Sequence, residues 1–368
     1  MRSTLLLISL LFSSTSLLAT PLGLPEVPVP ADNPQTEAKI ALGDKLFHDA
    51  RFSSTGDISC ATCHDAKKGF TDSPLSVSQG IGNLEGTRNA PTVINAAYMK
   101  TMFWDGREPD LEGQSAGPFV NPVEMGLKDH NPILDIVRTD PEYVEAFKAV
   151  FSKHGDAVTM TEVKKAIASF ERTIIAGDSP FDHYYFGGDE TAMNESEIRG
   201  LQVFLGQGRC VSCHTTNQNT AIFTDNRFHN IGIGFARVTN DVTSIVQAYQ
   251  HSKKQGEDLD VAVLTKGNVS ELGRYVVTDK VTELGAFKTP TVRNVEVTGP
   301  YMHDGSLETL EDVVNFYNNG GVVDENDPVD PFTSGGIRPL NLDDQQKADL
   351  VNFLKALTSP EFAQSAKK

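Results

Sequence analysis

The chain has 368 residues, of which 39% are hydrophobic, and this length suffices for one large domain or two ordinary domains with buried cores. Its 32 lysines and arginines stand against 49 aspartates and glutamates, which gives a formal charge of -17 at pH 7. Such a surface repels the phosphates of nucleic acids and of anionic lipids. The composition therefore argues against nucleic-acid binding and favours a basic or dipolar protein partner.

The first twenty residues have the pattern of a secretory signal. An arginine at position 2 is followed by the apolar run 5–12 and by a stretch rich in serine and threonine that ends near Ala19. We expect residues 1–20 to be a signal peptide that directs the chain to the bacterial periplasm, with no membrane insertion after cleavage. An uncleaved anchor is the alternative, because a cut after Ala19 would place Leu17 where a small residue is preferred.

Three segments of the first half differ in their hydrophobic pattern. Residues 42–47 (Leu-Gly-Asp-Lys-Leu-Phe) have apolar positions three to four apart and predict a helix. The stretch 71–132 is rich in glycine, proline and asparagine and has little periodicity, and such long irregular segments in compact proteins are usually functional. A second helix is predicted over 161–175, where apolar residues fall on one face.

The second half opens with a helix whose sequence resembles the first one. Residues 199–204 (Arg-Gly-Leu-Gln-Val-Phe) form a weak repeat of residues 42–47, and Asn194 and Glu197 have the spacing of a capping box. A polar run interrupts the pattern just before this helix. We therefore predict two domains, 21–185 and 186–368.

The rest of the second half is also helical in pattern. A helix is predicted over 343–357, while clusters of valine and isoleucine are too short and isolated for a sheet of any size. The stretch 238–271 is polar and charged. This composition predicts an exposed segment that could shape the choice of partner.

All four cysteines of the chain fall in two C-x-x-C-H pentapeptides. The motifs consist of Cys60, Cys63 and His64, and of Cys210, Cys213 and His214. Two thiols at this spacing can form thioethers with the two vinyl groups of haem c, and the imidazole that follows can reach the iron. A thioredoxin-like redox pair and a tetrahedral zinc site are the alternatives, although disulfides alone would not require the histidines.

We predict one covalently bound haem c for each motif, with His64 and His214 as iron ligands. A helix precedes each motif, and the intervening pattern is helical as well. The predicted fold class is therefore mostly α, with two cytochrome-c-like domains that each carry one haem c.

Five further strings add a family resemblance. They are Asn-Ala-Pro-Thr-Val-Ile-Asn (89–95), Phe-Trp-Asp-Gly-Arg (103–107), Asn-Pro-Val-Glu-Met-Gly (121–126), Phe-His-Asn-Ile-Gly (228–232) and Pro-Tyr-Met-His-Asp-Gly (300–305). In this order they resemble the bacterial di-haem cytochrome c peroxidase superfamily, which includes the MauG-type enzymes. The resemblance runs from about Leu42 to Leu357. It implies two cytochrome-c-like domains with a calcium ion between them, an N-terminal haem that meets peroxide and a C-terminal haem that relays electrons.

Carried over by position, the resemblance places Gln114 and Glu124 in the peroxide pocket and Trp104 between the haems. Splitting a peroxide requires a proton to move from one oxygen to the other, which a confined carboxylate can do, while an amide can hold the peroxide by hydrogen bonds. Without the resemblance, Glu124 would be read as a solvated loop residue and Trp104 as a packed core aromatic.

The calcium site is likewise implied by the resemblance alone. Its ligands would be the side chain of Asn89 and the backbone carbonyls of Thr298 and Pro300. Oxygen ligands of this kind suit a hard cation.

Two positions depart from the pattern of many peroxidases in this superfamily. The loop before residues 89–95 often holds a histidine that caps the peroxide haem, and the alignment puts Ile81 there, which cannot bind iron. The C-terminal haem of the peroxidases has a methionine ligand, and Tyr317 occupies the aligned place, as tyrosine does in MauG-type enzymes. A phenolate favours higher oxidation states than a thioether does. Both departures favour the MauG-like branch, with a peroxide haem that is open in the ferric state.

The leading hypothesis is an exported di-haem peroxidase that reduces hydrogen peroxide at the N-terminal haem, with electrons relayed through the C-terminal haem. A small redox protein, a cytochrome c or a cupredoxin, would donate the electrons. One alternative is a MauG-like oxidase that modifies side chains of a partner protein. Another is a non-enzymatic electron carrier with two saturated haems, for which Met99, Met102 and Met125 lie nearby in the sequence.

Overall fold

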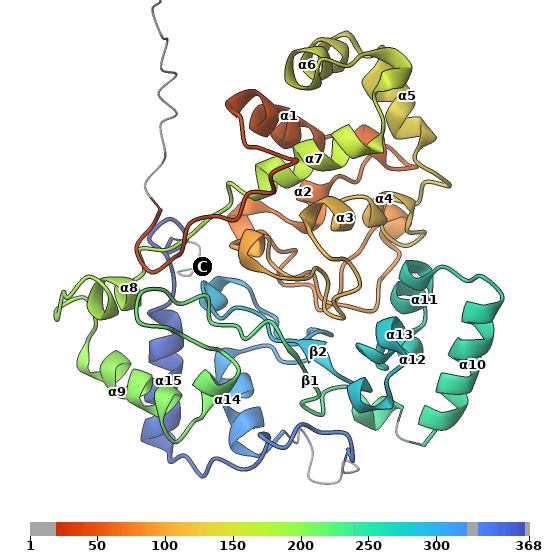
Figure 1. The fold of residues 1–368 in the computed structure, drawn as a ribbon. Helices are drawn as coiled ribbons and strands as arrows, with labels where there is room; N and C mark the ends of the chain where they lie inside the picture. Colours follow the sequence, from red (N-terminus) through yellow and green to blue (C-terminus); the bar gives the residue numbers. More distant parts are fainter. Residues whose placement is uncertain (1–19, 239, 322–329, 365–368) are drawn as a thin grey trace, which may run out of the picture.

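The structure, a computed structural model, describes residues 20–238, 240–321 and 330–364. Within these ranges the chain is mostly helical, as predicted, and Figure 1 shows separate groups of helices joined by long loops. The predicted signal peptide, residues 1–20, lies outside the described residues apart from Thr20. No helix in the described part of the chain is long and apolar enough to cross a membrane.

The helices fall into three groups in space, and the second group joins helices that lie before and after the third group in the sequence (Figure 1). The first group contains α1 (Glu37–Phe47), α2 (Cys60–Cys63), α3 (Leu111–Gln114), α4 (Gly117–Val120), α5 (Asn131–Thr139), α6 (Pro141–Phe151) and α7 (Met160–Glu171). The second contains α8 (Pro180–Tyr185), α9 (Glu195–Leu205), α14 (Leu310–Asn318) and α15 (Asp344–Lys355). The third contains α10 (Val242–Lys254), α11 (Leu259–Thr265), α12 (Gly267–Ser270) and α13 (Tyr275–Thr278).

Each cysteine motif follows a helix that packs against a later helix: α1 packs on α7, and α9 packs on α15. A Cβ atom at Gly43 of α1 would lie 1.9 Å from the carbonyl oxygen of Ala166, and one at Gly200 of α9 would lie 2.0 Å from that of Asp349. Both glycines belong to the weak repeat. The repeat therefore reflects one close helix crossing that occurs in both halves.

The predicted helices are present in the structure, but α1 begins at Glu37 rather than at residue 42, and α7 has a different end. The capping box of Asn194 and Glu197 at the start of α9 is confirmed, and α15 lies within the predicted range. Helix α7 ends at Glu171 rather than at residue 175. After Glu171 the backbone forms hydrogen bonds with Asn95, which lies in an earlier loop. The backbone N–H of Asn95 donates to the carbonyl of Ile174 at 2.9 Å, and its side-chain oxygen accepts from the N–H of Ala176 at 3.0 Å.

Two hydrophobic cores follow the two halves of the chain. The first is built around α1, α5, α6 and α7 and contains fully buried rings such as Phe119 and Phe147. The second is built around α9, α14 and α15 and contains Phe204 and Phe353. Phe181 of α8, four residues before the end of the predicted first domain, packs in the second core. We refer to the two cores with their surrounding loops as the N-terminal and C-terminal lobes.

Regular strands are almost absent from the described residues, as predicted. Strands β1 (Phe228–His229) and β2 (Phe287–Lys288) form one short antiparallel pair.

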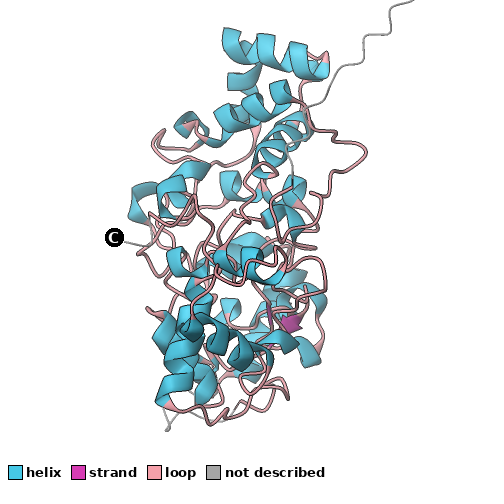
Figure 2. Cartoon of the chain, turned by 90° about the vertical axis from the view of Figure 1, so that its left-hand side faces the viewer, coloured by secondary structure: helices cyan, strands magenta, loops and turns pink. Residues whose placement is uncertain are grey.

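Figure 2 shows long loops running through the middle of the molecule, with helices above and below them. These loops include much of the irregular stretch 71–132, and they carry most of the residues of the candidate site.

The segment 238–271 was predicted to be exposed, and most of its described residues are exposed or half-buried, but it also forms helices that the sequence analysis did not predict. Helices α10, α11 and α12 share a third hydrophobic core, in which Ile245, Tyr249 and Val263 are buried. Polar residues in the segment lie on the outer side of these helices, while apolar residues between them are buried. The hydrophobic pattern was hidden because the three helices are short and each buries only a few side chains.

Candidate haem and peroxide site

One large cavity of about 690 Å³ lies between the lobes, and both C-x-x-C-H motifs line it. The cavity wall includes every residue that the sequence analysis assigned to a site. These residues are Cys60, Cys63, His64, Asn89, Trp104, Gln114, Glu124, Cys210, Cys213, His214, Thr298, Pro300 and Tyr317. Segments more than 250 residues apart in sequence thus meet around one space.

The two motif histidines are held in the orientation that an iron ligand needs. The Nδ1 atom of His64 lies 3.2 Å from the carbonyl oxygen of Phe70, and that of His214 lies 3.0 Å from the carbonyl of Phe223 and 3.1 Å from that of Pro290. An Nδ1–H that donates to a carbonyl fixes the tautomer and leaves Nε2 available for a metal. Burial lowers the pKa of both imidazoles, which keeps them neutral. The donor set therefore fits haem c.

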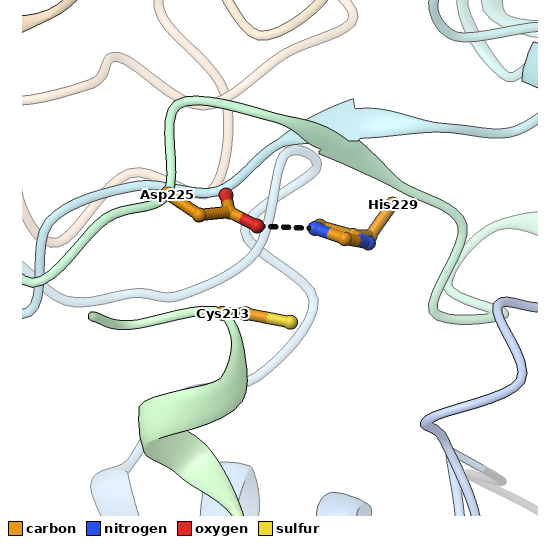
Figure 3. A group of neighbouring side chains, drawn as sticks. All are labelled: Cys213, Asp225 and His229. Atoms are coloured by element: carbon orange, nitrogen blue, oxygen red, sulfur yellow. Dashed lines mark hydrogen bonds and ion pairs between the residues drawn. The ribbon is translucent and has the colours of Figure 1, made fainter.

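The thiols do not form the alternative zinc site. The described residues contain two clusters of potential metal ligands, and neither combines thiols from both motifs. One cluster consists of Cys213, Asp225 and His229 (Figure 3), in which His229 Nε2 lies 2.8 Å from a carboxylate oxygen of Asp225. A thioether at Cys213 would leave this cluster with two donors. The other cluster, Glu271, His303 and Asp304, is ion-paired to Arg237.

Glu124 and Gln114 line the same cavity as the first motif. Gln114 is the last residue of α3, and Glu124 lies in the loop after α4. Burial raises the pKa of Glu124 to about 7, against the opposing effect of the nearby Arg107 guanidinium, and the Asp260 carboxylate raises it further. A carboxyl group with a pKa near neutrality can both accept and return a proton at physiological pH.

Ile81 does not reach the cavity. Its backbone N–H donates to the carbonyl of Glu124 at 2.8 Å, and its side chain packs against Gly126. Met99, Met102 and Met125 do line the cavity, but Met102 and Met125 are buried in hydrophobic clusters. The loop in which a capping histidine was considered thus places the apolar side chain of Ile81 against Gly126 and not on the cavity wall.

Trp104 connects the lobes by hydrogen bonds at both of its ends. Its indole Nε1–H donates to the carbonyl of Asn89 at 2.9 Å, and its own carbonyl accepts from the N–H of Lys288 in β2 at 2.8 Å. Tyr317, near the end of α14, lines the cavity from the C-terminal lobe, and burial raises the pKa of its phenol.

The three proposed calcium ligands, Asn89, Thr298 and Pro300, all line the cavity. The side-chain amide of Asn89 lies 3.1 Å from the carbonyl oxygen of Ser76. The carbonyls of Thr298 and Pro300 accept no hydrogen bond from any residue that the structure describes. These carbonyl oxygens are therefore available to a cation.

The sequence analysis assigned no role to several charged residues on the cavity wall, among them Glu171, Lys288 and Arg107. Glu171 is 5% exposed, has a carboxylate oxygen without a partner among the described residues, and has its pKa raised to about 8 by burial. Lys288 donates to the carbonyl of Thr101 at 2.6 Å, and burial lowers its pKa to about 8. Arg107 is buried between two carboxylates. A signal existed for Glu171, which lies four residues after Ile167 on the apolar face of its helix.

The fold and the cavity define a helical protein with two haem-attachment motifs facing a shared, carboxyl-bearing site. The profile of the family Di-haem cytochrome c peroxidase matches residues 37–191. Cytochrome-c peroxidase IdrP1 of Denitromonas iodatirespirans is 36% identical over 93% of this chain and 87% of its own length. The methylamine utilization protein MauG of Methylorubrum extorquens is 34% identical over 90% of this chain and 81% of its own.

A solved structure supports the same assignment. The crystal structure of a MauG-like protein associated with microbial copper homeostasis superposes with a TM-score of 0.74 at 31% identity, covering 94% of this chain and 98% of that one. The chain therefore belongs to the di-haem cytochrome c peroxidase and MauG family. Its cofactors are two haems, and it is a peroxidase, so the alternative of a non-enzymatic electron carrier is set aside.

Proposed function

We propose that the protein reduces hydrogen peroxide at the part of the cavity shared by the first C-x-x-C-H motif, Gln114 and Glu124. Two electrons and two protons convert each peroxide into two waters, and the electrons enter through the C-terminal lobe from a small redox protein, a cytochrome c or a cupredoxin. Haem c, when bound, supplies the iron that takes up peroxide and the path for electrons. The observation that carries the proposal is a carboxyl group poised near neutrality beside the first motif.

The residues of this chain have distinct tasks in the proposal. Cys60 and Cys63 hold one haem and Cys210 and Cys213 the other, through thioethers. The Glu124 carboxylate accepts a proton from one peroxide oxygen and returns it to the other, while the Gln114 amide holds the peroxide by hydrogen bonds. Trp104 lies between the lobes and connects the two haems for electron transfer. Its position is supported by two hydrogen bonds, from its indole N–H to the carbonyl of Asn89 and from the backbone N–H of Lys288 to its own carbonyl.

A second candidate function is supported by Tyr317. A phenolate ligand on the C-terminal haem favours higher oxidation states, which suits a MauG-like oxidase that draws electrons from side chains of a partner protein instead of from a small redox protein. The position of Tyr317 on the cavity wall and the packing of Ile81 against Gly126 instead of on that wall are consistent with this branch. A turnover assay with cytochrome c and cupredoxin donors separates the two, because an oxidase of protein side chains would use neither efficiently.

We also propose how the chain is divided into domains, where it is exported and where it binds calcium. Two cytochrome-c-like domains, 21–185 and 186–368, would each hold one haem, and residues 1–20 would direct export to the periplasm. A calcium ion would be bound by Asn89, Thr298 and Pro300 at the boundary of the lobes. The unbonded carbonyls of Thr298 and Pro300 support this site.

The central test is the variant Glu124→Gln, which keeps the shape of the side chain and removes its proton-accepting oxygen. We expect the second-order rate constant for peroxide to fall by about 100-fold with unchanged haem spectra. Glu85→Gln, an exposed residue in a neighbouring loop, serves as the matched control and should react like the wild type. Unaltered peroxide turnover in Glu124→Gln would remove the proposed role.

Electron paramagnetic resonance of the ferric protein tests the state of the two haems. One high-spin and one low-spin haem is the expected result, because Ile81 provides no ligand to the first haem. Two low-spin haems in the ferric protein would contradict peroxide chemistry without prior reduction.

A further inference from the structure

A chain of buried charges runs along the wall of the peroxide site. Arg88 Nη1 lies 2.7 Å from one carboxylate oxygen of Asp105, and Arg107 Nη1 lies 3.1 Å from the other. The Nε–H of Arg107 donates in turn to the carboxylate of Asp260. The side chains of Arg88, Asp105 and Arg107 are at most 4% exposed, and that of Asp260 is 23% exposed. Three of these residues come from the loop 88–107, and the fourth comes from α11.

Asp260 reaches this loop because the segment 238–271 docks on the N-terminal lobe. The hydroxyl of Thr87 donates to the carbonyl of Val263 at 2.7 Å, and the side chain of Asn121 lies 3.4 Å from the carbonyl of Asp260. Leu264 of the same helix lines the cavity. The segment thus supports two of the loops that form the peroxide site.

Arg107 is fixed in place from three sides. Its guanidinium contacts Asp105 and Asp260, and it lies over the ring of Phe103 at 3.5 Å from the ring centre. An arginine with a spare hydrogen-bonding direction would instead pair with the nearest free carboxylate, since such pairs are strong in a buried site. Arg107 and Glu124 both line the cavity, and the positive charge of Arg107 favours the ionised form of the Glu124 carboxyl.

The charged groups that act on Glu124 are few. Arg107 of the loop 103–107 favours the ionised carboxylate, and Asp260 of α11 opposes it. The thiols of Cys60 and Cys63 also lie on this side of the cavity, but attachment of haem would convert both to uncharged thioethers. Asp260, which is ion-paired to Arg107, is therefore the acidic side chain through which α11 offsets the charge of Arg107 at Glu124.

We propose that Asp260 is a positioning residue of the peroxide site, which holds Arg107 away from Glu124 and offsets its charge so that Glu124 stays free to exchange a proton. The inference rests on the proposed role of Glu124. It assigns a task in the reaction to the segment 238–271, which packs on the N-terminal lobe and contributes Leu264 to the cavity wall.

The test is a titration of Glu124 in the haem-loaded, peroxide-free protein. The infrared carbonyl band of the protonated Glu124 carboxyl, identified by its loss in Glu124→Gln, is followed against pH. In Asp260→Asn the midpoint should fall by about one pH unit, because the charge of Arg107 is no longer offset. In the double variant Arg107→Gln/Asp260→Asn the midpoint should return to the wild-type value or above it. Asp241→Asn, an exposed residue before α10, is the control and should leave the midpoint unchanged.

Several outcomes would overturn the inference. An unchanged midpoint in Asp260→Asn, with the segment 238–271 as resistant to proteolysis as in the wild type, would show that Asp260 only anchors the segment. If Asp260→Asn releases the segment, the single variant Arg107→Gln replaces it in the test. The midpoint of Glu124 should rise in Arg107→Gln, and an unchanged midpoint would refute the effect of the Arg107 charge on Glu124. The titration needs no peroxide, so the two proposals are tested separately. If Glu124→Gln keeps its peroxide reactivity, the proposed function is overturned, but the effect of Asp260 and Arg107 on the titration of Glu124 can still be measured.

Discussion

The pH dependence of the reaction with peroxide follows from the burial of Glu124. Burial raises its pKa from 4.5 to about 7, a difference of roughly 3 kcal/mol between the charged and neutral forms. The group must be a carboxylate to accept the first proton, and it is mainly a carboxylate only above its pKa. The rate constant for peroxide should therefore rise with pH and level off above about 7. Between about pH 8 and about pH 5.5 it should fall roughly 30-fold.

Stopped-flow mixing of the ferric protein with peroxide, at constant ionic strength, measures this profile. Glu124→Gln should give a slow and nearly flat profile over the same range, while Glu85→Gln should reproduce the wild-type curve. A wild-type rate constant that is flat from about pH 5.5 to about pH 8, or that declines as pH rises, would refute the reasoning. The first result would mean that Glu124 has an ordinary pKa, and the second that its acid form is the reactive one.

Three further predictions concern other parts of the molecule. Gly43→Ala or Gly200→Ala should lower the free energy of unfolding by about 2 kcal/mol in a denaturant titration, because the new methyl group meets a helix backbone, whereas Gly267→Ala, which has open space around it, should change it little. Tyr317→Phe should change only the low-spin resonance signal, and an unmoved signal would reject Tyr317 as a ligand. Glu171 has a pKa raised to about 8, so the folded state holds its proton while the unfolded state releases it, and stability is lost as pH rises from about 5 to about 8. The stability advantage of Glu171→Gln over the wild type should grow across this range, and a constant difference would contradict the burial of an unpartnered carboxyl.

The haem motifs and the main helices could be predicted because their signals are local. Two cysteines and a histidine within five residues determine the attachment chemistry whatever the rest of the chain does. The helices α1, α7, α9 and α15 were identified from apolar spacing and, for α9, from its capping box, and the structure confirms their existence with small differences at the ends. The end of α7 was mispredicted because a loop 76 residues earlier, around Asn95, takes over its hydrogen bonds.

The segment 238–271 illustrates what a local pattern leaves out. Its polar composition predicted an exposed stretch but no helices, because the buried side of each short helix contains too few apolar residues to be noticed. Its role depends on contacts with residues more than 130 positions away, such as Thr87 and Asn121. The same holds for Arg107. One of its carboxylate partners, Asp105, lies in its own loop, and the other, Asp260, lies in the distant helix α11.

The sequence by itself determined the chemistry of attachment, the family and the helical class, since these depend on residue types at short, fixed spacing. The tertiary structure decided which side chains share the cavity and how strongly each holds a proton. Burial and the distance between charges determine the behaviour of Glu124, Arg107 and Asp260, and both arise only when loops and helices distant in the chain pack together.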